Sequence, residues 1–223
     1  MEETERIKKH YQDYTNNLTV DINSTHAIYN NQIVKERLNL FKQIIISKYK
    51  NTEKIKFMEI GAGAGSNIPF FNSLGIKDEN IYANELVEDR SQKLKLNFPN
   101  ITVLSGDALQ IKMENAFDIV FQSTVFTSIL DLNFKKKLSK NLWEMTKTGG
   151  MVLWYDFMYN SPNNKSVKGI DKSEIKLLFN DSKNIEFFKV TLAPPIGRRF
   201  QNWYSFLNSF SFLRTHVIAV IHK

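Results

Sequence analysis

From Lys54 onward, short apolar runs alternate with longer segments whose apolar residues recur at helical spacing. The runs predict strands at residues 55–60, 80–84, 101–104, 117–122 and 151–157. The intervening segments predict helices at residues 66–74, 89–98 and 133–145. Strands that alternate with helices pair in parallel through crossover connections, so we predict an α/β fold with a doubly wound sheet.

The N-terminal part of the chain does not follow this alternation. Residues 4–14 and 32–49 predict helices, and the segment between them, rich in Asn, Asp and Thr, predicts a loop. We therefore expect an N-terminal helical cap over residues 1–50 and a main domain over residues 51–223.

Towards the C-terminus, residues 186–192 and 216–221 predict two more strands. Between them lie a Pro-Pro turn and the aromatic stretch 200–213, for which we expect a helix. This stretch suits peripheral attachment to a membrane near lipid-linked glycans. Because the flanking charges are sparse, the sequence favours packing against the protein or a partner instead.

Composition removes several classes of protein. The 223 residues fit one substantial domain, and 42% of them are hydrophobic, which suffices for a core. The absence of Cys excludes disulfide scaffolds, thiolate zinc sites and Cys nucleophiles. No His, Asp and Glu residues show metal-ligand spacing, so we predict no metal. The first residues lack an apolar signal region, and we expect a cytoplasmic protein.

The net charge of +7 is compatible with an anionic partner, such as nucleic acid or an anionic membrane surface. The lysines are scattered along the chain, however, and no Arg-rich run is interleaved with aromatic residues. We therefore expect a solvated basic surface rather than a nucleic-acid-binding one.

The first predicted strand runs into the segment Glu59-Ile60-Gly61-Ala62-Gly63-Ala64-Gly65, which precedes a predicted helix. A glycine-rich turn of this kind lets the backbone approach a ligand, and the following helix offers unpaired amide groups. Glu85 follows Gly65 by 20 residues, at the end of the next strand, where a carboxylate can accept ribose hydroxyls. The G-x-G-x-G spacing and Ser66 depart from the dinucleotide fingerprint, and no Tyr-x-x-x-Lys pair is present.

Four motifs together resemble the class I S-adenosylmethionine-dependent methyltransferases. They are E-x-G-x-G-x-G at residues 59–65, the acid Glu85, Ser105-Gly106-Asp107-Ala108 and Phe117-Asp118-Ile119-Val120. The resemblance implies a Rossmann-like seven-stranded sheet of order 3-2-1-4-5-7-6, with strand 7 antiparallel. It also implies S-adenosylmethionine as the cofactor.

The resemblance implies roles for single residues. Gly61, Gly63 and Gly65 would line the methionine part of the cofactor, and Glu59 would orient its amino group. Around the rest of the cofactor it implies Glu85 at the ribose, Asp107 and Ala108 at the adenine, and Gln122 and Ser123 beside the methyl group. In the cap, Tyr11 and Tyr14 are candidates for covering the ligand, although simple packing explains them equally well.

After the fourth predicted strand, Gln122-Ser123-Thr124-Val125-Phe126 replaces the Asn/Asp-Pro-Pro-aromatic motif of enzymes that methylate adenine amino groups. A second resemblance, in the C-terminal half, is to bacterial methyltransferases of glycan and surface-polysaccharide assembly. It includes Trp154-Tyr155-Asp156-Phe157, Thr191-Leu192-Ala193-Pro194-Pro195 and Phe212-Leu213-Arg214-Thr215-His216. This resemblance implies methylation of a sugar hydroxyl, or of another small molecule.

A hydroxyl acceptor benefits from a general base. Asp156, at the end of the fifth predicted strand, and His216, at the start of the last, are the candidates. Arg198 and Arg199 are candidates for binding a phosphate or carboxylate on the acceptor. Two other functions stay open: a non-catalytic regulatory protein that binds S-adenosylmethionine, and an RNA methyltransferase.

Overall fold

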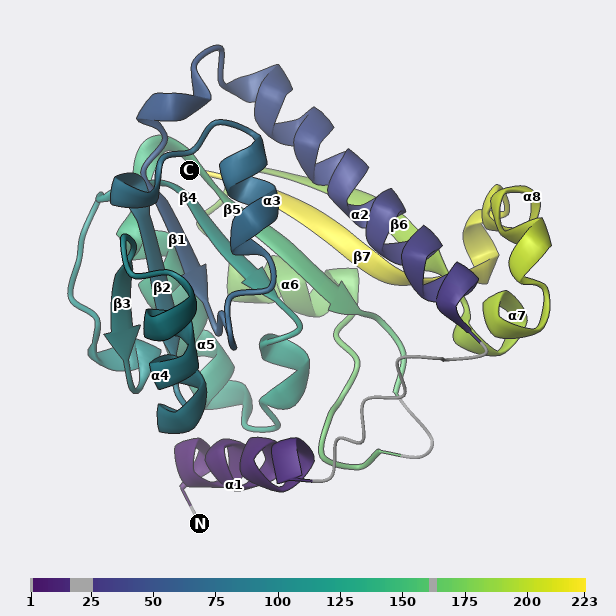
Figure 1. The fold of residues 1–223 in the computed structure, drawn as a ribbon, viewed down its shortest axis with the longest axis horizontal. Coiled ribbons are helices and arrows are strands. Elements are labelled where there is room, and N and C mark those ends of the chain that lie inside the picture. Colours follow the sequence, from purple (N-terminus) through teal and green to yellow (C-terminus); the bar gives the residue numbers. More distant parts are fainter. Residues whose placement is uncertain (1, 17–25, 161–163) are drawn as a thin grey trace.

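Residues 2–16, 26–160 and 164–223 are described by the computed structural model, in which a seven-stranded sheet has the order β3-β2-β1-β4-β5-β7-β6 (Figure 1). The strands are β1 Phe57–Ile60, β2 Ile81–Glu85, β3 Thr102–Ser105, β4 Phe117–Ser123, β5 Thr146–Phe157, β6 Asn184–Leu192 and β7 Arg214–His222. The first five pair in parallel, and β7 runs antiparallel to both β5 and β6. The predicted fold, strand order and strand direction are confirmed.

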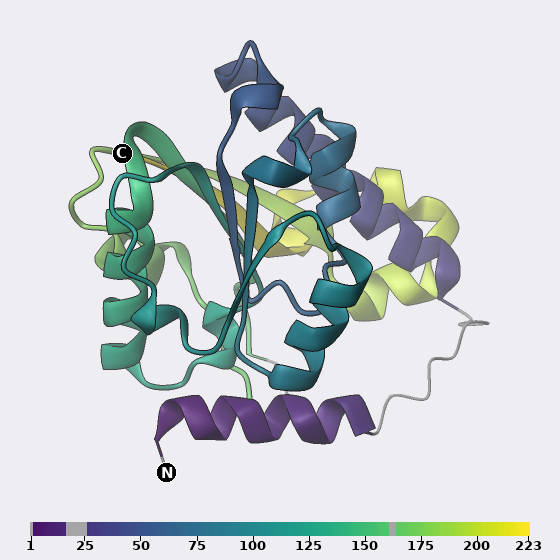
Figure 2. The ribbon, with the colours of Figure 1, turned by 60° about the vertical axis from the view of Figure 1, so that its left-hand side comes forward.

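Helices cover both faces of the sheet. Helices α2, α3 and α4 lie on one face and α5 and α6 on the other, while α1 lies across one edge of this sandwich (Figures 1 and 2). The helices are α1 Glu3–Asn16, α2 Ala27–Lys48, α3 Ile68–Ser73, α4 Glu88–Asn97, α5 Leu132–Met145, α6 Lys172–Leu178, α7 Pro194–Arg199 and α8 Tyr204–Asn208.

The central strands are buried on both faces, which explains their continuous apolar sequences. In β5, Val152 and Trp154 point into the core beneath α5 and α6. Met151 and Leu153, which alternate with them, point into the core beneath α2, α3 and α4. The alternation of side chains along a strand therefore divides one apolar run between two cores.

Helix α2 differs from the prediction in extent and in placement. It begins at Ala27 rather than at residue 32, and its Phe41 and Ile45 are fully buried in the core shared with the sheet. The helix is thus one layer of the α/β sandwich, although its sequence precedes the alternating pattern.

Three further predictions need correction. The fifth strand was predicted to begin at residue 151, but β5 begins at Thr146, directly after α5, so Gly149 and Gly150 lie within it. Helices α6 and α7 had no predicted counterpart. The stretch 200–213 is broken into 3₁₀ turns and the short α8, because it packs too few apolar residues on one face to sustain a longer helix.

Within the described ranges, no helix combines the length and the apolar character needed to cross a bilayer.

Candidate cofactor and active site

The glycine loop leaves the carboxyl end of β1 in a conformation that favours glycine. Gly61, Gly63 and Gly65 have φ angles of +70°, +60° and +89°. A Cβ atom on Gly61 would lie 2.5 Å from Val125 Cγ2, whereas one on Gly63 would meet nothing within 4 Å. The loop therefore packs against the segment after β4 at Gly61, and at Gly63 its backbone is open to the space above the sheet.

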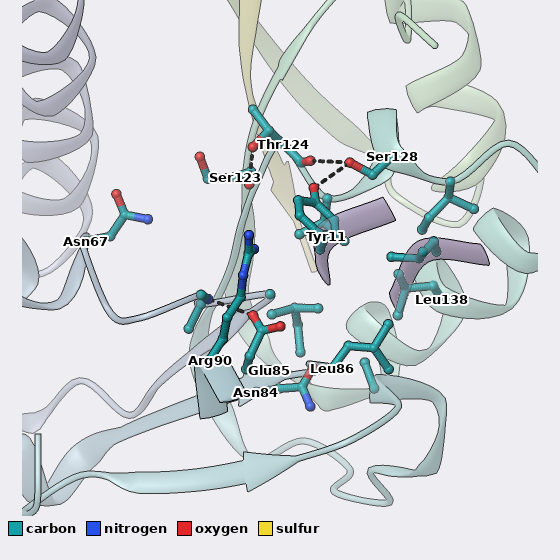
Figure 3. Close-up of a pocket in the computed structure, with 18 of the residues that line it drawn as sticks. Tyr11, Asn67, Asn84, Glu85, Leu86, Arg90, Ser123, Thr124, Ser128 and Leu138 are labelled. Atoms are coloured by element: carbon teal, nitrogen blue, oxygen red, sulfur yellow. Dashed lines mark hydrogen bonds between the residues drawn. The ribbon is translucent and has the colours of Figure 1, made fainter. Parts of the chain in front are cut away.

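That space is a cavity of about 350 Å³ at the carboxyl ends of β1, β2 and β4 (Figure 3). Open α/β sheets bind their ligands at this edge, where the strand order reverses. The walls include backbone of the glycine loop, the side chains after β2 and β3, and residues 123–125 and 128–129 after β4. Helix α1 contributes Ile7 and Tyr11, so the N-terminal helix forms one wall of the cavity.

Glu85, at the end of β2, carries the most constrained carboxylate on this wall. Its side chain is buried; Oε2 accepts a hydrogen bond from the Gly63 N–H at 2.7 Å, and Oε1 accepts one from the Val87 N–H at 2.8 Å. Each oxygen retains a second lone pair. Glu85 can thus fix the glycine loop and still accept hydroxyl groups from a ligand.

Asp107 lies on the same wall, after β3. Its Oδ1 accepts from the Leu109 N–H at 2.9 Å, and the Thr4 hydroxyl of α1 donates to Oδ2 at 3.4 Å. Ala108 also lines the cavity, and its carbonyl accepts from Asn141 Nδ2 at 2.7 Å. The turn-forming role and a ligand-binding role of Asp107 are therefore compatible, because each uses a different part of the carboxylate.

Glu59 does not reach the cavity wall. It is buried beneath the glycine loop, and its Oε1 accepts from Asn67 Nδ2 at 2.7 Å, whereas Oε2 has no hydrogen-bond partner among the described residues. Burial raises the pKa of Glu59 to about 7. Asn67 does line the cavity, so it connects Glu59 to the methionine-binding region that the sequence predicts.

The cavity residues that sequence reasoning missed include Arg37 from α2, Asn84 from β2 and Arg90 from α4. The Arg37 guanidinium lies 4.8 Å from the ring centroid of Tyr155, and that of Arg90 lies 4.6 Å from the ring of Tyr11. No motif marks Arg37, because α2 precedes the glycine loop. Asn84 and Arg90 lie close to Glu85 in the sequence, so the predicted ribose site could have indicated that they line the cavity.

Asp156 and Gln122 lie beneath the segment after β4 and not on the cavity wall. The Thr127 hydroxyl donates to Asp156 Oδ1 at 2.7 Å, and Gln122 Nε2 donates to Oδ2 at 3.0 Å. Gln122 Oε1 in turn accepts from the Val125 N–H at 3.0 Å. Burial raises the pKa of Asp156 to about 7.

These contacts engage the carboxylate of Asp156, which the sequence indicates as a candidate base. Asp156 is fully buried and both of its carboxylate oxygens are engaged, so it holds the segment 122–128 in place. Ser123, which was expected beside the methyl group, does line the cavity, whereas Gln122 supports it from below.

His216 lies near the cavity but not on its wall. Its ring stacks on Tyr155 at 5.3 Å between centroids, and Nδ1 lies 3.0 Å from the Thr215 hydroxyl. Burial, together with the charge of Arg37, lowers the pKa of His216 to about 4, so the imidazole is neutral at neutral pH. Arg37 therefore lies between the cavity and the Tyr155–His216 pair.

Two further predicted residues lie away from this cavity. Arg198 and Arg199 are exposed on α7 and do not line it. The side chain of Tyr14 lies outside the described residues, whereas Tyr11 points into the cavity and its hydroxyl lies 2.7 Å from Ser128 Oγ (Figure 3). In the described part of the chain, no three His, Asp or Glu side chains gather as a metal site.

Comparison with known proteins agrees with this geometry. Residues 58–154 match a family described as a methyltransferase domain, and this range includes the glycine loop, Glu85 and Asp107. A search of curated protein sequences found no match.

Solved structures share the fold at low sequence identity. An S-adenosylmethionine-dependent methyltransferase from Archaeoglobus fulgidus is 14% identical, with a TM-score of 0.61, and the alignment covers 83% of this chain and 94% of that one. Magnesium protoporphyrin IX methyltransferase from Synechocystis, solved with its cofactor bound, is 12% identical, with a TM-score of 0.61 and 97% of both chains covered. A phosphoethanolamine N-methyltransferase from Haemonchus contortus is 17% identical, with a TM-score of 0.55, and 81% of this chain and 52% of that one are covered.

The cavity fits the cofactor that this class of protein uses. A glycine loop open at Gly63, a buried carboxylate at Glu85 and a second one at Asp107 surround a space that suits a nucleoside joined to an amino acid. The matched domain contains all three features. Residues 58–154 therefore match a methyltransferase domain, and the whole chain has the fold that solved S-adenosylmethionine-dependent methyltransferases share.

Proposed function

We propose that this protein is an S-adenosylmethionine-dependent methyltransferase, that it transfers the methyl group to an oxygen atom of a small molecule, and that the acceptor is a sugar hydroxyl. The observation that carries the proposal is the enclosure of the cavity. Helix α1 covers it through Ile7 and Tyr11, and the segment after β4 closes another side. This enclosure favours a small acceptor over a nucleic-acid strand.

The hydroxyl groups of the cavity wall support a polyhydroxylated acceptor. Ser123, Thr124, Ser128 and Tyr11 all line the cavity, and hydroxyl side chains both donate and accept hydrogen bonds. The structural neighbours named above include enzymes whose names give small-molecule substrates, a porphyrin and phosphoethanolamine. Those substrates are not sugars, so the neighbours support a small-molecule acceptor but do not support a sugar in particular.

The bound cofactor supplies an electrophilic methyl group on its sulfonium. The protein must orient the acceptor, exclude water and remove the hydroxyl proton. Of the two candidate bases, we propose His216, because its imidazole is neutral at neutral pH and lies near Arg37 of the cavity wall, with Nδ1 on the side of the Thr215 hydroxyl. We assign Asp156 to positioning, since Gln122 and Thr127 occupy both of its oxygens.

A methyl-transfer assay tests this proposal. The enzyme is incubated with methyl-labelled S-adenosylmethionine and separate panels of nucleotide sugars, free sugars, carboxylic acids, amines and RNA, and the products are identified by mass spectrometry. We expect labelled methyl ethers from the sugar panels. Turnover confined to amines or to RNA would overturn the proposal.

Two variants then separate the roles at the base. His216→Gln should lower kcat by about two orders of magnitude, the usual contribution of a general base, and leave cofactor affinity unchanged. Asp156→Asn should retain most of its kcat, because the amide can keep hydrogen bonds to Gln122 and Thr127. A large loss of kcat in Asp156→Asn, with most of the kcat retained in His216→Gln, would instead identify Asp156 as the base.

A further inference from the structure

An ordered group of exposed aromatic side chains lies outside the cavity, and we call it the aromatic patch. It comprises Phe200, Trp203, Phe206, Phe210 and Phe212, whose exposed fractions are 46%, 63%, 59%, 40% and 73%. Consecutive rings contact one another: Trp203–Phe206 at 6.2 Å, Phe206–Phe210 at 5.5 Å and Phe210–Phe212 at 5.8 Å between centroids. Large aromatic side chains gathered on a protein surface mark an interaction site.

The patch is held rigidly on the protein. Glu36 of α2 accepts from the Tyr204 hydroxyl at 2.6 Å and from Asn208 Nδ2 at 2.7 Å, which fixes α8. Gly197 of α7 packs so closely on Tyr29 that a Cβ atom would lie 2.2 Å from its ring. Helices α7 and α8 thus form a platform at the end of the sheet beside the start of α2, apart from α1 (Figures 1 and 2).

The segment that carries the patch is basic. Residues 187–214 contain Lys189, Arg198, Arg199 and Arg214 but no Asp or Glu. Arg198 and Arg199 are exposed at the end of α7, and the Arg199 guanidinium lies 5.8 Å from the ring of Phe200. The nearby acid Glu36 is engaged by α8 and by the Thr191 N–H.

We propose that the aromatic patch docks the enzyme onto the surface of a membrane that contains anionic lipids. Phe and Trp side chains insert at the boundary between headgroups and acyl chains, where Trp is especially favourable. Arginines beside them pair with lipid phosphates, and the absence of acids across residues 187–214 removes repulsion from an anionic surface. Because the arginines beside the rings are positively charged, we assign the patch to a bilayer that contains anionic lipids.

Two other occupants fit the patch less well. A second copy of this chain, paired about a two-fold axis, would bring Arg198 and Arg199 towards their own copies with no acid in the segment to neutralise them. Single-stranded nucleic acid stacks its bases on ring faces. Here the rings meet edge to face, at 74° for Trp203–Phe206 and 86° for Phe206–Phe210, so they do not offer a row of parallel faces to successive bases.

Vesicle co-sedimentation tests the proposal with the full chain. Wild-type protein is mixed with vesicles of phosphatidylcholine alone and with vesicles in which part of it is replaced by phosphatidylglycerol. We expect binding to the anionic vesicles that weakens as salt is added. The combined variant Trp203→Ser, Phe206→Ser and Phe212→Ser should lower that binding about tenfold or more. Arg198→Gln with Arg199→Gln should remove the preference for the anionic lipid.

Leu96→Ser with Leu177→Ser is the matched control, since these side chains are 81% and 54% exposed elsewhere on the surface. The control should bind vesicles as the wild type does, and every variant should retain cofactor affinity and thermal stability. The proposal would be overturned if the wild-type protein did not co-sediment with the anionic vesicles. The proposal would also be overturned if the wild type formed a dimer in light scattering, or bound single-stranded RNA, and only the aromatic variant lost that association. Because no readout depends on methyl transfer, this result is independent of the proposed acceptor.

Discussion

The carboxylate of Glu85 links the backbone of the glycine loop to the cavity. Gly63 and Val87 each donate a backbone N–H to it, and the remaining lone pairs of its oxygens face outward from those bonds. A buried carboxylate whose two oxygens accept backbone hydrogen bonds is held in one orientation. The same residue therefore sets the shape of the loop and presents an acceptor to a ligand.

Replacing Glu85 should weaken cofactor binding. Glu85→Gln substitutes a donor for one acceptor oxygen, and hydrogen bonds to a charged group are worth about 1.5–3 kcal/mol. We expect the Kd for S-adenosylhomocysteine, measured by isothermal titration calorimetry, to rise about tenfold or more. Glu88→Gln, at an exposed position on α4, is the control and should bind as the wild type does. Equal affinity of all three proteins would remove Glu85 from the site.

Asp156 should make stability depend on pH. Its pKa is about 7 in the folded protein and near the ordinary value of 3.8 in the unfolded chain. Between these values the folded state holds a proton that the unfolded chain has released. The stabilising contribution is thus complete at low pH and is lost as the pH rises through 7.

Asp156→Asn removes this titration without removing the hydrogen-bonding shape. The free energy of unfolding of the variant, relative to the wild type, should increase by up to about 1.4 kcal/mol per pH unit between the two pKa values. Urea titrations at several pH values measure it. A difference between the two proteins that stays constant with pH would contradict the raised pKa.

At the scale of elements, α1 is attached to the cavity by a small set of contacts. Arg6 donates to the carbonyl of Ser128 and pairs with Glu3 at 2.8 Å, and Glu3 accepts from the Leu130 N–H at 2.6 Å. Tyr11 adds its contact with Ser128. Since α1 forms a wall of the cavity, these contacts should slow the release of the cofactor.

Arg6→Ala should loosen α1 without unfolding the sheet. Loss of its hydrogen bonds is worth about 1 kcal/mol, which corresponds to a factor of about five in affinity. We expect faster dissociation of S-adenosylhomocysteine in stopped-flow measurements, at unchanged thermal stability of the apoprotein. Lys8→Ala on the same helix removes only an exposed pair with Glu5 and serves as the control. Identical dissociation rates for both variants would show that α1 does not retain the ligand.

The element scale also separates what the sequence anticipates from what it misses. Strands β1 to β5 and their glycine loop were predictable, because hydrophobic periodicity and turn-forming residues act locally. Helices α6 and α7 were not, since they are one or two turns long and carry no complete amphipathic repeat. The start of α2 was missed because Asn30 and Asn31 resemble loop sequence, although the neighbouring Tyr29 is buried and anchors this turn of the helix.

At the scale of the whole molecule, the two cores share one sheet. Phe41 of α2 packs edge to face on Phe121 of β4 at 5.3 Å and on Tyr155 of β5 at 6.3 Å between centroids. Helix α2 is therefore tied to the centre of the sheet, and the molecule should unfold in one step.

The variant Phe41→Ala tests whether α2 and the sheet unfold together. Truncation of a fully buried Phe costs about 3–5 kcal/mol, and here it should lower the stability of helix and sheet together. Far-ultraviolet circular dichroism and Trp fluorescence should report one coincident transition in both wild type and variant. Two separate transitions, with the sheet unaffected by Phe41→Ala, would instead favour an independent cap over residues 1–50.

The sequence by itself determined the strands of the sheet and their alternation with helices, because apolar runs and turn-forming residues act locally. The sheet order and the cofactor followed from the resemblance that the glycine loop and the acids at strand ends carry. Only the tertiary structure decided which side chains face the cavity. In the folded protein Asp156 is buried against Gln122 and Thr127, whereas Arg37 and Tyr11 line the cavity. The rings of the aromatic patch are exposed. Burial and orientation arise from contacts between residues that are distant in the chain, and no local pattern of residues encodes them.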